Sequence, residues 1–172
     1  MINILCYSAN KYSELVKNNV IYTFTIGRKG KSKRIIIDFT NNEFYHLAGL
    51  HYIKDVEFPS PKAEEIFLLI RDNNEFQEKI LASSKLPKII ERLTHIEHLD
   101  AVLNHPDDVV VWEQKRANFS TNLKADYLVS RMHDSVYDIF GIKKVQMNTT
   151  REIRLLSRRI INIPMAKQNG RF

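Results

Sequence analysis

A β-hairpin that follows a helix is the sequence feature that most constrains how this chain can fold. Residues 20–26 (VIYTFTI) are β-branched or aromatic, and threonines alternate with apolar neighbours as in a strand with one buried face. Residues 27–32 contain two glycines and predict a turn, and residues 33–39 predict the returning strand. The spacing of apolar residues over 2–17 predicts a helix before the hairpin, ended by Asn18 and Asn19.

The order of the later elements indicates the fold class. After the hairpin the sequence predicts helices over 43–52, 62–71, 75–84 and 87–104, then strands over 109–112, 127–132 and 135–142. Thr40, Asn41 or Asn42 would cap the first of these helices. Residues 153–161 fit a strand or a helix equally poorly. Because helices and strands are grouped and do not alternate, we predict an α+β fold. Its antiparallel sheet would carry an N-terminal helix, with a helical block inserted between the first hairpin and the later strands.

Chain length and composition restrict the architecture and the compartment. A chain of 172 residues is long enough for one ordinary domain, which we expect to span 1–172. We expect a helical segment at about 61–104 and a basic C-terminal tail at about 151–172 within it. Cys6 is the only cysteine, so neither an internal disulfide nor a cysteine-based zinc site is expected. The sequence shows no secretory signal and no apolar stretch approaching a membrane span of ~20 residues, so we expect a soluble cytoplasmic protein.

Positive charge is concentrated in two segments of the chain. The formal net charge is +6, but residues 28–34 carry five positive side chains and no negative one. Residues 151–172 carry a net charge of +5, which leaves −4 for the rest of the chain. This distribution predicts contact with a polyanion such as RNA. The predicted nucleic-acid-binding residues are Arg28, Lys29, Lys31, Lys33, Arg34, Arg151, Arg158 and Arg159.

The sequence does not predict a metal site or a bound cofactor. His46 and His51 are five residues apart, which on a continuous helix separates them by about 140° around the axis. They could share a metal only if the helix broke between them, for which Gly49 is a candidate. His95 and His98 share a helical face, but no second half of a carboxylate–histidine site is evident. Nucleophile-elbow and Walker-type phosphate-loop motifs are also missing.

The residue inventory fits RNA cleavage without a metal. In that reaction the ribose 2′-hydroxyl is the nucleophile, so the protein supplies a base, an acid and cations that neutralise charge on the phosphorane. Histidine suits both proton-transfer roles near neutral pH, and arginine suits the cationic role. Strand alternation places Tyr127, Val129, Arg131 and His133 on one face, which would form a phosphate-handling surface. The alternative is an ordinary solvated face of an antiparallel sheet.

His46, Arg131, Arg154 and Tyr127 are the predicted catalytic residues. Arg154, with Arg158, would extend the cationic lining if the last segment is a strand. For His46, a catalytic role and simple packing beside Leu47 and Leu50 are both open. His51 is a weaker candidate because it would project near Phe44 and Leu47.

Three sequence segments together resemble a known nuclease group. They are residues 11–15 (KYSEL), 22–30 (YTFTIGRKG) and 44–51 (FYHLAGLH). Residues 126–130 (DYLVS) and 136–142 (VYDIFGI) are similar to the later strands of the same group. The chain thus resembles the phage-encoded branch of the Barnase–EndoU–colicin–RelE (BECR) nuclease superfamily, most distinctively in the segment that contains His46.

The resemblance implies N-terminal helices packed on an antiparallel sheet of four or five strands, and metal-independent RNA cleavage of a toxin or phage–host-conflict type. Only His46 lies in the distinctive segment, so Tyr127, Arg131 and Arg154 come from strand patterns and not from the family. The helical segment 61–104 is not required by the compact superfamily core, which leaves room for a non-catalytic descendant.

Two functions follow from the sequence. The first is a metal-independent endoribonuclease that acts through 2′-hydroxyl attack, without a cofactor and with RNA as its partner. The alternative is a non-catalytic protein of phage origin that binds nucleic acid or inhibits a nuclease. A protein partner or antidote, meeting the basic segments instead of RNA, is a further alternative, and no membrane partner is expected.

Overall fold

The chain folds into two compact units, and each unit contains segments that are distant in sequence. A computed structural model describes residues 3–28, 31–111, 125–133, 136–146 and 153–164. The helical unit consists of Met1–Ile21 and Asp38–His98, and the sheet unit consists of Tyr22–Ile37 and Leu99–Phe172. The expectation of one domain over 1–172 stays a prediction.

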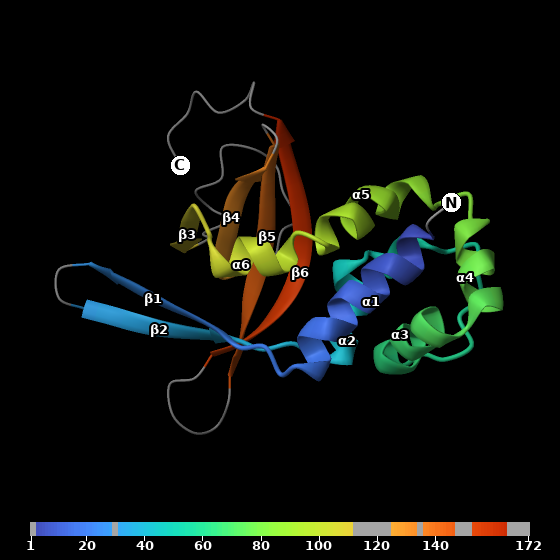
Figure 1. The fold of residues 1–172 in the computed structure, drawn as a ribbon, viewed down its shortest axis with the longest axis horizontal. Helices are drawn as coiled ribbons and strands as arrows, with labels where there is room; N and C mark the ends of the chain where they lie inside the picture. Colours follow the sequence, from blue (N-terminus) through green and yellow to red (C-terminus); the bar gives the residue numbers. More distant parts are fainter. Residues whose placement is uncertain (1–2, 29–30, 112–124, 134–135, 147–152, 165–172) are drawn as a thin grey trace. The chain divides into compact units, whose positions relative to one another are not determined.

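The helical unit contains five α-helices and a short 3₁₀ helix within its described residues (Figure 1). These are α1 (Ile4–Lys17), α2 (Asn41–Leu47), η1 (Leu50–Tyr52), α3 (Ala63–Asp72), α4 (Asn74–Leu81) and α5 (Pro87–Ile96). Helix α1 packs against α5 and α3, and α2 packs against α3 (Figure 1). The first helix begins where Asn3 accepts hydrogen bonds from the Leu5 and Cys6 amides, and it ends before Asn19, whose φ of 46° is left-handed.

Aromatic rings form the centre of the helical unit. Tyr12 of α1 lies with its ring centroid 5.5 Å from Phe44 of α2 and 5.8 Å from Phe67 of α3. Phe44 and Phe67 are 4.9 Å apart, and none of the three side chains is exposed. The Tyr12 hydroxyl donates to the Thr40 carbonyl at 2.8 Å, which satisfies its polar atom within the core. This cluster joins three helices and thereby fixes the position of α2.

Helix α2 begins at a capping interaction between Thr40 and Glu43. The Thr40 amide donates to the Glu43 carboxylate at 2.8 Å, and the Thr40 hydroxyl donates to the same carboxylate. Glu43 is buried, and a carboxylate in the first turn also complements the positive end of the helix. The expected cap among residues 40–42 is therefore confirmed as Thr40.

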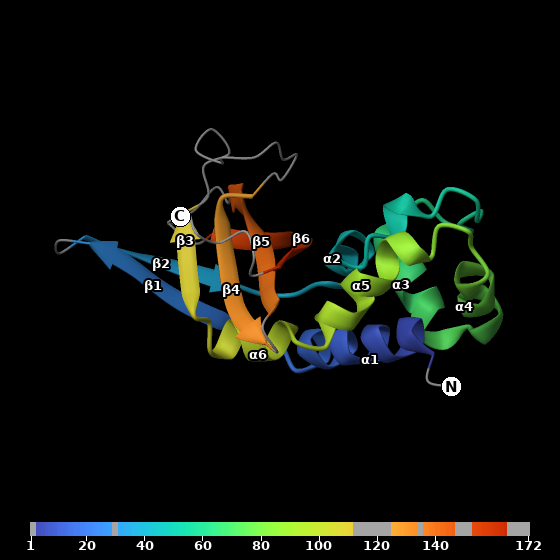
Figure 2. The same ribbon diagram turned by 90° about the horizontal axis from the view of Figure 1, so that it is seen from above.

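The sheet unit contains a hairpin, one helix and a four-stranded antiparallel sheet within its described residues (Figure 2). Its elements are β1 (Tyr22–Arg28), β2 (Lys31–Ile37), α6 (Leu99–Asn104), β3 (Asp108–Val111), β4 (Tyr127–His133), β5 (Val136–Gln146) and β6 (Ile153–Pro164). Strands β1 and β2 pair with each other, and the sheet has the order β3-β4-β5-β6. The α+β class is confirmed, as is the helical block between the hairpin and the later strands.

A partly buried hydrogen bond attaches the hairpin to α6. The Tyr22 hydroxyl donates to the Asp100 carboxylate, and the Tyr22 side chain is buried at the start of β1. Burial raises the pKa of Tyr22, and the bond to Asp100 raises it further, so the phenol stays protonated and remains a donor. Strand β2 also contacts β6, which connects the hairpin to the four-stranded sheet.

Some segments differ from those expected. The helix expected over 43–52 is divided into α2 and η1. Residues 87–104 form two helices, because the His98 amide bonds to the His95 carbonyl in an i→i−3 turn that ends α5. The segment left open at 153–161 is strand β6, which pairs along its length with β5. No helix among the described residues is long and apolar enough to cross a membrane.

Candidate functional site

His46 lies on the outer side of the last turn of α2. Phe44 and Leu47 are both fully buried on the inner side of this helix, whereas the His46 side chain is exposed. The helical period places His46 opposite the apolar positions that hold α2 in the core. The imidazole is therefore accessible, while its backbone is fixed by the packing of its neighbours.

A break at Gly49 brings His51 back beside His46. Gly49 has a φ of 76°, in the left-handed region, and η1 begins at the next residue. The ring centroids of His46 and His51 are 5.9 Å apart, with an interplanar angle of 47°. The condition stated from the sequence, a helix break at Gly49, is thus met. The weaker candidate, His51, is a close neighbour of the stronger one.

Two tyrosines border the histidine pair. Tyr45 lies 5.4 Å from the His46 ring and 6.5 Å from the His51 ring, measured between centroids. Tyr52 lies 4.1 Å from His51. Burial raises the pKa of Tyr45, which keeps its phenol protonated at neutral pH. The Tyr45 phenol therefore adds a neutral polar group and not a negative charge.

Arg92 of α5 supplies a cation at this place. Its Nη1 lies 3.4 Å from the His46 carbonyl oxygen and 3.5 Å from that of Leu47. Its guanidinium carbon lies 5.3 Å from the centroid of the Tyr52 ring, within range of a cation–π interaction. We call His46, His51, Tyr52 and Arg92 the histidine site. Sequence reasoning missed Arg92, because it is 46 residues from His46 and belongs to no motif.

The histidine site places two imidazoles, which are common proton-transfer groups in proteins, next to each other. An ordinary imidazole titrates near pH 6.5, so two neighbouring imidazoles can act as base and acid in one reaction. As metal ligands, the pair offers two nitrogen atoms, fewer than the three protein ligands typical of catalytic zinc. The prediction that no metal or cofactor is needed stays a prediction.

The strand residues predicted to be catalytic lie in the sheet unit, whereas His46 lies in the helical unit. Tyr127 is 2 % exposed and Val129, two residues along the same face, is fully buried. That end of the predicted phosphate-handling face is therefore part of a core and not a solvated surface. Arg131 is half-buried, and its Nη1 donates to the Ala101 carbonyl of α6 at 2.9 Å. The catalytic roles of Tyr127 and Arg131 stay predictions.

The sheet register separates Arg131 from Arg154. Arg131 pairs with Asp138 of β5, and Arg154 of β6 pairs with Val145 of β5. These partners are seven positions apart on β5, which corresponds to roughly 23 Å along the strand. The backbone positions of the two arginines are therefore well separated along the sheet, and their predicted catalytic roles stay predictions.

The first basic segment lies mainly in strands and not in the turn. Arg28 pairs with Lys31 at the end of the hairpin, while Lys33 and Arg34 pair with residues of β1 further from the turn. The predicted turn over 27–32 was too long because the sequence marks the glycines but not the pairing register. Lys29 and Arg151 lie outside the described residues.

Arg158 and Arg159 of the last basic segment lie in the middle of β6. Arg159 pairs with Gly141 and Ser157 pairs with Ile142, so Arg158 is the extra residue of a β-bulge. Bulges bend a strand and change the direction of the residue that they contain. Strand β6, which contains Arg154, Arg158 and Arg159, thus pairs regularly with β5 except at this bulge. Their predicted role in RNA binding stays a prediction.

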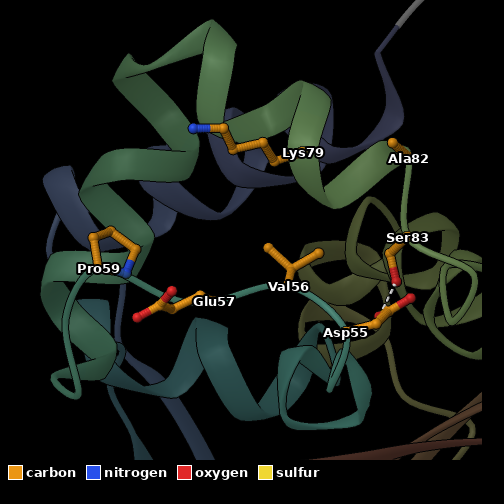
Figure 3. Close-up of a pocket in the computed structure, with 7 residues that line it drawn as sticks. All are labelled: Asp55, Val56, Glu57, Pro59, Lys79, Ala82 and Ser83. Atoms are coloured by element: carbon orange, nitrogen blue, oxygen red, sulfur yellow. Dashed lines mark hydrogen bonds between the residues drawn. The ribbon is translucent and has the colours of Figure 1, made fainter.

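A separate hollow of about 720 Å³ lies between the segment 55–59 and helix α4 (Figure 3). Its rim includes Asp55, whose carboxylate accepts hydrogen bonds from the Ser83 hydroxyl at 2.6 Å and from the Ser84 amide at 2.9 Å. Figure 3 shows the bond between Asp55 and Ser83 at one end of the hollow. These bonds lower the pKa of Asp55 to about 2, and the bond from Ser83 has the largest effect. They fix the turn between α4 and α5.

Asp55 is expected to make stability depend on pH in the acidic range. Because its pKa is lower in the folded protein than in the unfolded chain, its contribution is complete above about pH 4 and is lost as the pH falls toward 2. We expect the urea midpoint of the native protein to fall more steeply than that of Asp55→Asn between pH 4 and pH 2. If the urea midpoints of the two proteins fell equally with pH, the hydrogen bonds of the Asp55 carboxylate would not stabilise the fold.

Comparison with known proteins places the chain in a nuclease family. A family model described as "phage-Barnase-EndoU-ColicinE5/D-RelE like nuclease4" (PBECR4) matches residues 4–169. The match spans segments of both units, and the chain therefore belongs to this family. The resemblance to the phage branch of these nucleases is confirmed. Comparisons with curated proteins and with solved structures found no match.

Proposed function

We propose that the protein is a metal-independent endoribonuclease that cleaves RNA through attack of the ribose 2′-hydroxyl. The 2′-oxygen forms a bond to phosphorus, the bond from phosphorus to the 5′-oxygen breaks, and the product carries a 2′,3′-cyclic phosphate. One base removes the 2′-hydroxyl proton and one acid protonates the 5′-oxygen that leaves. His46 is the proposed residue for one of these roles, and membership of a phage-type nuclease family supports the proposed class of activity.

The observation that carries this proposal is the pairing of two imidazoles across the break at Gly49. His46 is exposed, and its ring centroid lies 5.9 Å from that of His51, close enough for one ribose–phosphate unit to contact both rings. A base and an acid held at fixed spacing are what the reaction requires. We therefore extend the proposal to His51 as the second proton-transfer residue. Arg131 remains a proposed phosphate contact, and Arg154 would contact a different phosphate.

The proposal is tested by incubating the purified protein with labelled structured RNA and with DNA of the same sequence, in EDTA, from pH 5 to pH 9. We expect cleavage of RNA and not of DNA, with a bell-shaped dependence of kcat/KM on pH. Cleavage of both polymers, or cleavage that requires a divalent ion, would contradict the proposed mechanism.

The strand-borne basic residues are proposed to bind the RNA backbone. Replacing Arg28, Lys31, Lys33 and Arg34 with glutamine should weaken RNA binding and reduce the slope of log K against log[salt] by up to about 3, because each phosphate contact on a single strand contributes about 0.7. A matched control has the same change in net charge but replaces cations that already pair with carboxylates. It consists of Lys11→Gln, Lys62→Gln, Arg71→Gln and Lys79→Gln.

Equal losses of affinity in the two quadruple variants would show that net charge, and not the hairpin, determines binding. Fluorescence anisotropy with a short labelled RNA at several salt concentrations gives both the affinity and the slope. The control variant should keep a slope close to that of the native protein, because its cations are partly neutralised by neighbouring carboxylates.

A non-catalytic nucleic-acid-binding or nuclease-inhibiting protein is the second candidate function. It is favoured by the state of two predicted catalytic residues, since Tyr127 is buried and the Arg131 guanidinium donates to the Ala101 carbonyl within the sheet unit. This candidate predicts the same salt-dependent binding but no product at any pH. The RNA and DNA incubation described above therefore separates the two functions.

A further inference from the structure

Arg92 contacts the chain on both sides of the break at Gly49. Before the break, its Nη1 lies 3.4 Å from the His46 carbonyl oxygen and 3.5 Å from the Leu47 carbonyl oxygen. After the break, its guanidinium carbon lies 5.3 Å from the ring centroid of Tyr52. One side chain of α5 therefore joins the end of α2 to η1.

The aliphatic part of Arg92 packs directly on Gly49. A methyl group added to Gly49 would lie 2.7 Å from Cδ and 3.2 Å from Nε of Arg92, and 3.3 Å from Cγ2 of Ile89. A contact of 2.7 Å is closer than carbon atoms approach in proteins, so no larger residue fits without displacing Arg92. Glycine at position 49 thus permits both the left-handed backbone and the close approach of the arginine.

We infer that Arg92 is a positioning residue that holds α2 and η1 together and thereby fixes the spacing of His46 and His51. It is linked to the two histidines by different contacts. It contacts the carbonyl of His46 directly, and it contacts Tyr52, whose ring lies 4.1 Å from that of His51. The catalytic consequence of this inference rests on the proposed function. The geometric consequence does not.

The chemistry of this place favours arginine over lysine. A planar guanidinium can donate in its plane to carbonyl oxygens while one face lies over an aromatic ring, which the compact ammonium of lysine cannot do. A cation beside the last carbonyls of α2 also complements the negative end of that helix. Arg92→Lys should therefore keep the charge but retain only part of the contacts with the two carbonyls and the Tyr52 ring.

The test uses Arg92→Met, Arg92→Lys and the matched control Lys88→Met, which removes an exposed cation one turn earlier on α5. The first measurement is the nuclear Overhauser effect between the ring protons of His46 and His51, which needs no activity. The second is kcat and KM for RNA cleavage in EDTA, at a temperature where thermal melts show each variant to be folded. Gly49→Ala is a second route to the same displacement, because its methyl group would push against Arg92.

We expect Arg92→Met and Gly49→Ala to lose the effect between the two rings and to lower kcat by up to about 100-fold, with little change in KM. Arg92→Lys should give intermediate values, and Lys88→Met should match the native protein. Loss of the ring-to-ring effect in a protein that cleaves no RNA at all would support the positioning role while refuting the proposed function. If the effect persists in Arg92→Met, the inference is wrong, and a rise in KM alone would assign Arg92 to direct contact with RNA.

Discussion

Replacing His46 with alanine is expected to lower kcat/KM for RNA cleavage by about 10²- to 10⁴-fold, the usual contribution of a positioned acid or base. The expected change in the free energy of unfolding is within about 0.5 kcal/mol, because the side chain is exposed on α2 and the buried neighbours Phe44 and Leu47 are untouched. RNA affinity should also stay nearly constant. Initial rates, urea denaturation and anisotropy on the same preparation measure the three quantities.

His105→Ala is the matched control for this experiment. His105 is also an exposed histidine, but it belongs to the sheet unit and is not part of the histidine site. Its replacement should leave kcat/KM within about twofold of the native value, since it removes no proposed proton-transfer group. If His46→Ala retained full activity, or lost RNA affinity with unchanged turnover, His46 would not be the proposed acid or base.

Replacing Phe44 with alanine is expected to lower the free energy of unfolding by about 3–5 kcal/mol. Its ring is fully buried and lies 4.9 Å from Phe67 and 5.5 Å from Tyr12, so truncation opens a cavity where α1, α2 and α3 meet. Because α2 carries His46, the folded fraction of this variant should also lose activity. Urea denaturation monitored by circular dichroism gives the stability.

Phe44→Leu and Tyr7→Ala are the controls for that stability change. Phe44→Leu keeps most of the apolar volume and should cost less than the alanine variant. Tyr7 also lies on a helix of the same unit but is 38 % exposed, so Tyr7→Ala should change stability much less. A loss below about 1 kcal/mol for Phe44→Ala would show that the aromatic cluster does not hold α2 in place.

Local sequence patterns were sufficient to predict the elements that depend on neighbouring residues in the chain. The helix before the hairpin, the two hairpin strands and the cap at Thr40 depend on periodicity, β-branched residues and a side-chain hydrogen bond within four residues. Strand β6 could not be assigned in the same way, because it is defined by pairing with β5 and not by its own period. The end of α5 at Ile96 has no glycine or proline to mark it.

The parts of the candidate site that lie within one short sequence motif could be predicted from that motif. His46 was found from its segment, and Gly49 was recognised as a place where the helix could break. The outcome of that break, His51 beside His46, depends on backbone angles that a pattern does not supply. Arg92 depends on how α5 packs against η1, so no local signal could have found it.

The chemistry of the RNA ends that the native protein produces in EDTA distinguishes attack by the ribose 2′-hydroxyl from other mechanisms of cleavage. Attack by the 2′-hydroxyl predicts fragments that end in 2′,3′-cyclic phosphate, detectable by mass spectrometry. A substrate with a single 2′-deoxy nucleotide at the cleaved position should resist cleavage there, because its nucleophile is missing. Fragments that end in 3′-hydroxyl groups, or cleavage that persists at the deoxy position, would contradict attack by the 2′-hydroxyl.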